Sequence, residues 1–197
     1  MAETEEIEKK PFLRRRRTDL EILGWEGGRI VMGPWIDEVR IVVGRLQMHA
    51  ELICGEGKAR EVGLGLHEII VNAIEHGSLG ISFKEKRLAL ENNTYVELLR
   101  QRLSDPFYSR RQVTIDCRTE PGELHYTVRD EGGGFDWRNP PCPDPRENLL
   151  SPCGRGLFLA RIYLDRVEFN ERGNEVHLVK YVERDGGRDE TTAEGEQ

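Results

Sequence analysis

The stretch KAREVGLGLHEIIVNAIEHG at residues 58–77 carries the pattern that decides the fold. At about 100° per residue, five aliphatic residues share one side of a helix: Val62, Leu66, Ile69, Ile70 and Ala73. Three more cover much of the opposite side: Leu64, Val71 and Ile74. A narrow polar strip separates the two groups: Glu68, Asn72, Glu75 and His76. A solvated helix face would be broad, so the thin strip predicts a helix that lies on a sheet and lines a pocket with its polar residues.

Two further helical regions flank this segment. Upstream, apolar residues at helical spacing predict a helix over about 35–53, after a short apolar stretch at 29–32. Downstream, residues 81–104 read as two short helices, because Ser82 with Glu85 and Thr94 with Glu97 have the spacing of a capping box. Pro106 is expected to end the second of these helices.

The hydrophobic period then changes to two, which is typical of strands. Residues 113–118 and 124–129 alternate apolar and polar side chains around a Pro121-Gly122 turn, which predicts an antiparallel hairpin. A helix is expected to begin near Gly154, followed by strands at 166–170 and 175–181. The predicted fold is α+β, a two-layer α/β sandwich with helices on one face of a mixed, mostly antiparallel sheet.

Composition sets the class of protein and the domain limits. The chain has 197 residues, 29 Lys and Arg against 36 Asp and Glu, and a formal net charge of −7. We expect a soluble cytoplasmic protein without a membrane span, because no apolar run is long enough to cross a bilayer. The acidic amino terminus predicts no secretory signal, and the acidic net charge predicts no direct nucleic-acid partner. The expected parts are a flexible charged leader at 1–26, one folded domain at 27–183 and a disordered acidic tail at 184–197.

Four cysteines lack the spacing of a metal or disulfide framework: Cys54, Cys117, Cys142 and Cys153. They are expected to be buried or free thiols. Cys142 and Cys153 flank a proline-rich loop, which leaves a redox or metal role open at those two positions.

Three separated segments carry the remaining chemistry, and no Walker A loop, Rossmann fingerprint or protein-kinase signature is present. They read Glu68-x-x-x-Asn72 with His76-Gly77, Asp130-Glu-Gly132-Gly-Gly134, and Gly154-Arg155-Gly156. In this order, they resemble the N, G1 and G2 boxes of the Bergerat-fold (GHKL) ATPases. The span from about 29 to 181 resembles the anti-sigma-factor serine kinase branch, with an ATP lid at about 136–153 and a helical insertion at about 81–108.

The resemblance implies a Mg²⁺·ATP site. It implies that Asn72 is a Mg²⁺ ligand, a role that a neutral amide oxygen suits, and that Glu68 is the general base for an attacking hydroxyl. It implies that Asp130 accepts a hydrogen bond from the adenine amine. Four glycines and one arginine complete the set near the nucleotide: Gly132, Gly134, Gly154, Gly156 and Arg155. Free N–H groups at a helix start favour phosphate, whereas Arg155 could pair with a phosphate or face solvent.

Each of these residues also has a structural reading. Taken alone, Asn72 could be a satisfied polar group in a helix, Glu68 a surface carboxylate and the glycines simple turns. His76 is expected to support the end of its helix, and Glu75 is left between a supporting role and plain surface exposure. The insertion is read as a packing elaboration, with a docking surface as the second hypothesis.

By resemblance, the expected activity is an ATP- and Mg²⁺-dependent serine/threonine kinase. Its expected partners are a STAS-type anti-anti-sigma protein and a sigma factor, and a homodimer is left open. Two other functions remain: an ATP-binding regulatory module or ATPase without protein-kinase activity, and a histidine-kinase catalytic domain. The last is ranked lowest, because only His49 and His67 precede the Asn72 motif and no helical hairpin with a phosphoacceptor histidine is recognisable.

Overall fold

The computed structural model describes residues 19–20, 27–138 and 155–182, with side chains placed at 27–138 and 156–182. Its strands form one six-stranded sheet in the order β1-β2-β3-β4-β6-β5. All five pairings are antiparallel. The strands are β1 (Asp19–Leu20), β2 (Gly27–Met32), β3 (Val113–Glu120), β4 (Glu123–Asp130), β5 (Arg166–Phe169) and β6 (Glu175–Tyr181).

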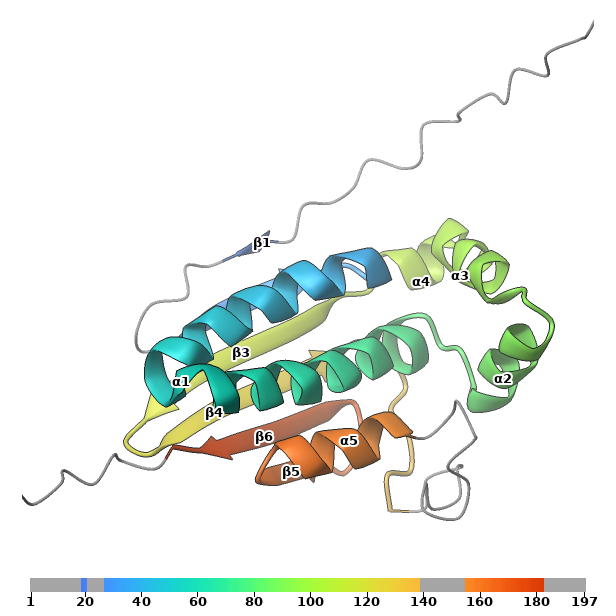
Figure 1. The fold of residues 1–197 in the computed structure, drawn as a ribbon. Helices are drawn as coiled ribbons and strands as arrows, with labels where there is room; N and C mark the ends of the chain where they lie inside the picture. Colours follow the sequence, from blue (N-terminus) through green and yellow to red (C-terminus); the bar gives the residue numbers. More distant parts are fainter. Residues whose placement is uncertain (1–18, 21–26, 139–154, 183–197) are drawn as a thin grey trace, which may run out of the picture.

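The long helix α1 and the shorter α5 lie side by side on one face of this sheet, and three further helices gather beyond one of its ends (Figure 1). The helical elements are a 3₁₀ turn η1 (Ile36–Glu38), α1 (Val39–Asn72), a π-helical turn η2 (Ala73–Ser78), α2 (Phe83–Glu91), α3 (Tyr95–Ser104), α4 (Pro106–Ser109) and α5 (Arg155–Tyr163). The predicted two-layer α+β fold is confirmed, and the sheet is antiparallel throughout its described strands rather than mixed.

Helix α1 consists of two helical segments joined at Gly55. There φ is 75° and ψ is 167°, a conformation outside the helical region that glycine adopts without a Cβ clash. The break separates the two helices predicted at 35–53 and 58–76. The second segment packs against α5 and the residue that follows it, Leu164, whose side chain would lie 2.8 Å from a Cβ on Gly65.

The core lies between the helices and the sheet. The five aliphatic residues predicted to share one helix face are all buried. On the opposite side Ile74 is buried, but Leu64 is 45% exposed, so the helix is less covered there than expected. In β3 and β4, the alternation predicted for the hairpin is confirmed by a row of buried side chains: Val113, Ile115, Cys117, Leu124, Tyr126 and Val128.

The helical insertion follows η2. Ser82 caps α2 through the predicted capping box with Glu85. The second predicted capping box is wrong, because Thr94 makes no side-chain cap bond: its φ of −109° and ψ of 16° lie outside the extended geometry of an N-cap. As predicted, Pro106 follows the end of the second helix: α3 ends at Ser104, and Asp105 before the proline is extended. Pro106 also begins α4, where Asp105 caps the turn by accepting a hydrogen bond from the Phe107 N–H.

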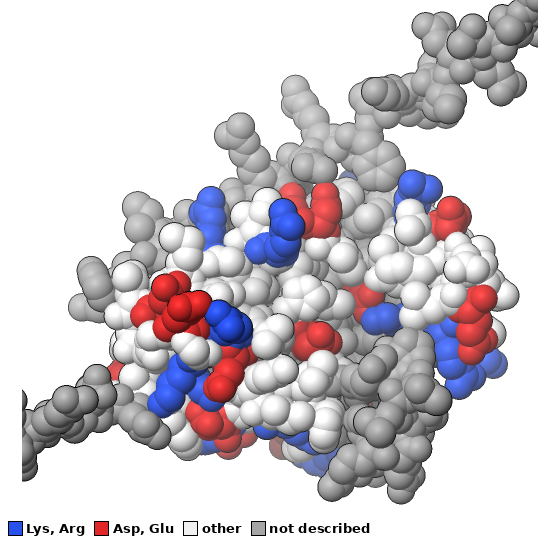
Figure 2. All heavy atoms as spheres, viewed as in Figure 1, with Lys and Arg blue, Asp and Glu red and all other residues white. Residues whose placement is uncertain are grey.

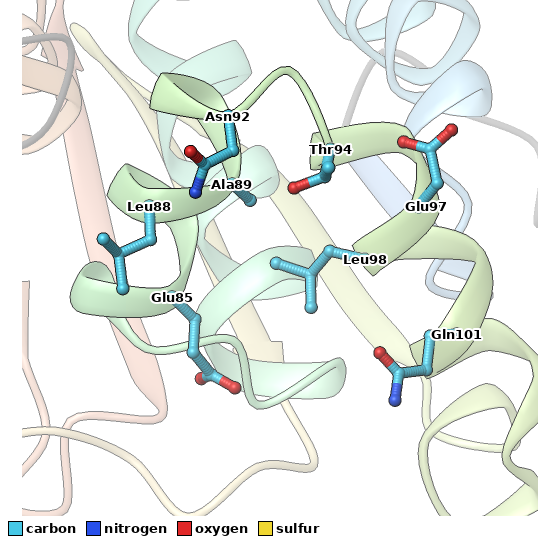
Figure 3. Close-up of a pocket in the computed structure, with 8 residues that line it drawn as sticks. All are labelled: Glu85, Leu88, Ala89, Asn92, Thr94, Glu97, Leu98 and Gln101. Carbon is cyan, nitrogen blue, oxygen red and sulfur yellow. The ribbon is translucent and has the colours of Figure 1, made fainter.

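An open pocket of about 340 Å³ lies between α2 and α3 of the insertion. Figure 3 shows it, with Leu98 pointing from α3 toward α2. Its lining is Glu85, Leu88, Ala89, Asn92, Thr94, Glu97, Leu98 and Gln101. None of the residues predicted to bind nucleotide lines this pocket.

Several sequence expectations lie outside the described residues. These are most of the 1–26 leader, the lid from 139 onward with Cys142 and Cys153, and the tail from 183. Within the leader, only Asp19–Leu20 is described, and it forms β1, which pairs with β2. Cys54 and Cys117 are free thiols, as expected. Burial raises the pKa of the Cys117 thiol to about 12, which keeps it protonated and unreactive. No helix among the described residues has both the length and the apolar content that a bilayer crossing requires.

Candidate functional site

Asp130 is the last residue of β4, where the strand end directs its side chain toward η2. The residue is only 8% exposed, and its Oδ1 accepts a hydrogen bond of 2.7 Å from the Gly132 N–H. A Cβ on Gly77 of η2 would lie 2.2 Å from the Asp130 Cγ, and one on Gly132 would lie 2.3 Å from the Gly77 carbonyl oxygen. The carboxylate is therefore seated between two backbone segments that only glycine allows to come so close.

Burial sets the charge state of this carboxyl group. Removal from water raises the pKa of Asp130 to about 6, and the Gly132 N–H together with the Arg111 and Arg172 guanidinium groups opposes that rise. The group is thus ionised above about pH 6, where it accepts hydrogen bonds through both oxygens. A buried carboxylate of this kind suits a ligand that brings its own N–H donor, such as an exocyclic amine.

Two arginines that the sequence did not single out hold the backbone around Asp130. Arg111 donates from Nη1 to the carbonyl oxygens of Gly77 at 3.3 Å and Ser78 at 3.1 Å. Arg172 donates from Nη2 to the Gly132 carbonyl oxygen at 3.1 Å. Both contacts join residues more than thirty positions apart, so no local pattern could have revealed them.

Gly134 is required by the neighbouring turn. Its φ is 80°, and a Cβ there would lie 2.0 Å from the Arg172 carbonyl oxygen. The loop after β4 thus packs against the β5–β6 turn, and the described contacts of Gly132 and Gly134 are with protein atoms of Gly77, Asp130 and Arg172. Their predicted approach to a nucleotide stays a prediction.

The second half of the site forms where α1 meets the start of α5. A Cβ on Gly156 would lie 2.7 Å from Glu68 Oε2 and 3.1 Å from Asn72 Nδ2. The two side chains are four residues apart on α1, so they project from the same face toward the first turn of α5. The structure therefore brings Glu68, Asn72 and Gly156 together, although they come from two distant parts of the sequence.

The polypeptide itself links the two halves. Asn72 ends α1 and Gly77 lies five residues later in η2, roughly 7 Å away at about 1.5 Å per helical residue. The π-helical form of this turn is marked by the Leu79 N–H donating to the Ile74 carbonyl oxygen at 2.8 Å. Insertions of this kind are frequent at functional sites. The chain thus runs directly from Asn72 to the turn that lies against Asp130, and a single site shared by the two halves stays a prediction.

The start of α5 offers free backbone N–H groups and the positive end of a helix dipole, which together favour an anion such as a phosphate. Gly154 lies outside the described residues, and for Arg155 only the backbone, which begins α5, is described. Their predicted phosphate contacts therefore stay predictions. Gly156 is the member of this segment whose neighbours the structure defines.

The donor set fits a hard divalent cation. Within the described residues, neither the Asn72 amide nor the Glu68 carboxylate makes a hydrogen bond, and the Glu68 side chain is 33% exposed. Nδ1 of the exposed His67 lies 3.8 Å from Glu68 Oε1. An amide oxygen beside a carboxylate provides the oxygen ligands that Mg²⁺ prefers, with room for waters and phosphate oxygens. Asn72 is the residue that would hold the ion.

Among the residues that the structure describes, a second group of side chains could gather around a cation: Glu120, Glu123 and His125. It lies at the opposite end of β4 from Asp130, about 20 Å along the strand. His125 Nε2 lies 2.8 Å from Glu123 Oε2, and Arg118 pairs with Glu120 at 3.3 Å. The Arg118 guanidinium offsets the charge of Glu120, and the cluster is separate from the candidate site.

The surface over the helices carries charges of both signs. Figure 2 shows acidic and basic side chains interspersed on the described part of this face, with mostly uncharged side chains over the region between α1 and α5.

No curated protein matches the chain. The sequence model of one protein family matches residues 36–180, which include Glu68, Asn72, Asp130 and Gly156, and that family is described as a histidine kinase-like ATPase domain.

Proposed function

Because the chain belongs to the family of histidine kinase-like ATPase domains, within the GHKL superfamily, we propose that it is an ATP- and Mg²⁺-dependent protein serine/threonine kinase of the anti-sigma-factor type. The proposed substrate is a serine or threonine on a STAS-type anti-anti-sigma protein, and the proposed second partner is a sigma factor. Transfer to the antagonist would change which partner the kinase holds.

One observation carries the proposal: the contact of Gly156 with both Glu68 and Asn72. It joins the residue expected to bind the ion, the residue expected to act as base and the helix start expected to hold phosphate. These are the groups that a phosphoryl transfer needs, because catalysis there is mainly positioning and neutralisation of charge. The partly exposed Glu68 carboxylate is reachable by a hydroxyl from a protein substrate.

The chemistry assigns one role to each residue. Asp130 accepts a hydrogen bond from the adenine amine, and the N–H groups at the start of α5 bind phosphate oxygens. Asn72 would hold Mg²⁺, which would supply positive charge to neutralise the phosphates. Glu68 takes the proton of the substrate hydroxyl while the hydroxyl oxygen forms a bond to the γ-phosphorus of ATP. The bond between the γ-phosphorus and the oxygen that bridges it to the β-phosphate breaks, and ADP leaves.

A second candidate is ATP hydrolysis without protein transfer. It is favoured by the exposure of Glu68, because a carboxylate that solvent reaches can also take a proton from water. The two functions share the same nucleotide site and differ only in the acceptor.

Incubation with ATP labelled at the γ-phosphate separates them. The chain is mixed with purified STAS-type proteins, and labelled protein and free phosphate are both measured. Label on one serine or threonine of a STAS protein, lost in Glu68→Gln, supports the kinase. Steady release of free phosphate without protein label supports hydrolysis, and the absence of ATP binding contradicts both.

A further inference from the structure

Glu75 is an acidic residue buried inside the candidate site's connecting turn. It lies in η2 between Asn72 and Gly77, and it is 1% exposed. A buried carboxylate is costly unless charged and hydrogen-bonded partners satisfy it, and removal of one partner leaves an uncompensated charge. The partners of Glu75 therefore decide where this turn can sit.

Both partners come from the helical insertion. Lys86 on α2 donates from Nζ to Glu75 Oε2, and Tyr95 on α3 donates its hydroxyl to Oε1. The Lys86 ammonium group is itself largely buried. Burial and the neighbouring Glu75 carboxylate raise the pKa of the Tyr95 hydroxyl, which keeps it a donor at all physiological pH values. Both oxygens of Glu75 are thus engaged by the insertion, and neither is available to a nucleotide.

The adjacent histidine adds a second attachment. His76 Nδ1 lies 2.5 Å from the Ile81 carbonyl oxygen, and its ring stacks on Phe83, the first residue of α2, at 4.2 Å. The Ile81 N–H in turn donates to the Glu75 carbonyl oxygen at 2.8 Å. The insertion therefore holds η2 through two consecutive residues.

At the other end of the same turn, Gly77 lies close to the Asp130 carboxylate. The Gly77 position fixes the carboxylate, because even a Cβ there would overlap its Cγ. A displacement of η2 by a few tenths of an ångström must therefore move the Asp130 oxygens, and hydrogen bonds weaken steeply once their distance and angle leave the normal range.

We propose that Glu75 is a positioning residue, through which Lys86 and Tyr95 of the insertion set the place of Gly77 against Asp130 and so the selectivity of the site for adenine over guanine. Adenine presents an amine donor where guanine presents a carbonyl acceptor. A carboxylate in the right place attracts the first and repels the second. The inference rests on the nucleotide site of the proposed function.

The test measures the dissociation constants of ATP and GTP, with Mg²⁺, for full-length protein. Glu75→Gln keeps the side-chain size but removes the charge, and Lys86→Met removes the other charge. Each is expected to lower the ratio of GTP to ATP dissociation constants by about tenfold, the size of one charged hydrogen bond lost. The Lys86→Arg variant is expected to recover most of the ratio, and a Glu75→Gln/Lys86→Met double variant to lose no more than the singles, because the two act through one contact.

The matched control is Glu85→Gln. It removes the ion pair between Glu85 and Arg102 at 2.5 Å and weakens the capping box with Ser82 at the start of α2. It leaves the contacts of Glu75 with Lys86 and Tyr95 in place, so it is expected to leave the selectivity ratio unchanged. A general loosening of the insertion would change the ratio in this control as much as in Glu75→Gln, which would overturn the inference.

The outcomes separate the inference from the proposed function. An unchanged ratio in a folded Glu75→Gln variant overturns the inference alone. Should Glu75→Gln fail to fold, Tyr95→Phe serves in its place, because it keeps the ring and the contact between Lys86 and Glu75. A lower ratio of GTP to ATP dissociation constants in this variant supports the inference, and an unchanged ratio overturns it. A wild-type protein that binds neither nucleotide removes both the inference and the proposed function.

Discussion

Replacement of Gly77 by alanine is the most informative single change at the candidate site. An ideal Cβ at this position lies 2.2 Å from Asp130 Cγ, whereas ordinary contacts begin at 3.4 Å. The backbone of Gly77 does not have the positive φ that favours glycine, so the alanine adds a steric conflict and no conformational strain. Either the turn or the carboxylate must therefore shift by about 1 Å.

The expected effect follows from what the carboxylate does. A shift of about 1 Å takes an N–H···O contact of about 2.9 Å outside hydrogen-bond range. A hydrogen bond to a charged group contributes about 1.5–3 kcal/mol, so the ATP dissociation constant is expected to rise about 10- to 150-fold. The lost Gly132–Asp130 bond lowers the free energy of unfolding, while better hydration of the carboxylate raises it, so the net change in stability is expected to be small.

The assay is calorimetric titration of ATP with Mg²⁺ at about pH 8, where Asp130 is ionised. Gly133→Ala is the matched control, because a Cβ there meets nothing within 4 Å although it lies in the same loop as Gly132. Urea unfolding of both variants verifies that they are folded. A Gly77→Ala protein that binds ATP as tightly as the Gly133→Ala protein would refute the reasoning.

Three further predictions concern the same site. Glu68→Gln is expected to reduce phosphotransfer by about 10²- to 10⁴-fold while ATP binding stays nearly the same, and undiminished label transfer would show that another group is the base. Asn72→Ala is expected to abolish the tightening of ATP binding by Mg²⁺, measured by titrations with the ion and with a chelator; equal tightening in wild type and variant would remove Asn72 as the ligand. ATP affinity of the wild-type protein is expected to fall as the pH drops from about 7 to about 5, because the Asp130 carboxyl takes up a proton near pH 6. Without nucleotide, the free energy of unfolding should instead rise as the pH falls from about 6 toward 4. The reason is that the Asp130 carboxyl binds its proton more tightly in the folded state than in the unfolded state. A flat affinity over this range would contradict the assigned role of Asp130.

The elements of the fold were predictable because their signals are local. The helical spacing of Leu66, Ile69 and Ile70 and the alternation along 113–118 and 124–129 report directly on which side of each element is buried. The break at Gly55 also lies where the two predicted helices were separated. The π-helical turn after Asn72 gave no such signal, because its hydrogen bonds are not encoded by side-chain periodicity.

Capping signals were less reliable than periodicity. Ser82 and Thr94 have the same spacing to a glutamate, yet only Ser82 adopts the extended backbone that lets its hydroxyl reach the N–H three residues on. Pro106 follows the end of α3, as its position predicted, and it also begins α4, a second role that the Asp105 cap reveals.

The candidate site was predictable where it depends on one helix and hidden where it depends on long-range packing. Glu68 and Asn72 are neighbours on any α-helix with that spacing. The close contact of Gly77 with Asp130 and the backbone support from Arg111 and Arg172 depend on how β4, η2 and the β5–β6 turn meet. No spacing in the sequence reports on those contacts.

Glu75 shows the same limit. From the sequence it was undecided between a supporting role and surface exposure, because its burial depends on Lys86 and Tyr95 closing over it from the insertion. Its place in the narrow polar strip with Asn72 and His76 was the available signal, and its partners lie 11 and 20 residues away in the sequence.

The most direct test of a single site built from α1, β4 and α5 is the stoichiometry and affinity of ATP binding, with Mg²⁺, in wild type, Asn72→Ala and Asp130→Ala. We expect one saturable site in the wild type, weakened about tenfold or more by either substitution, although the two residues come from different elements. Wild-type protein that shows no saturable binding, or binding that both substitutions leave intact, would mean that these elements do not form a nucleotide site.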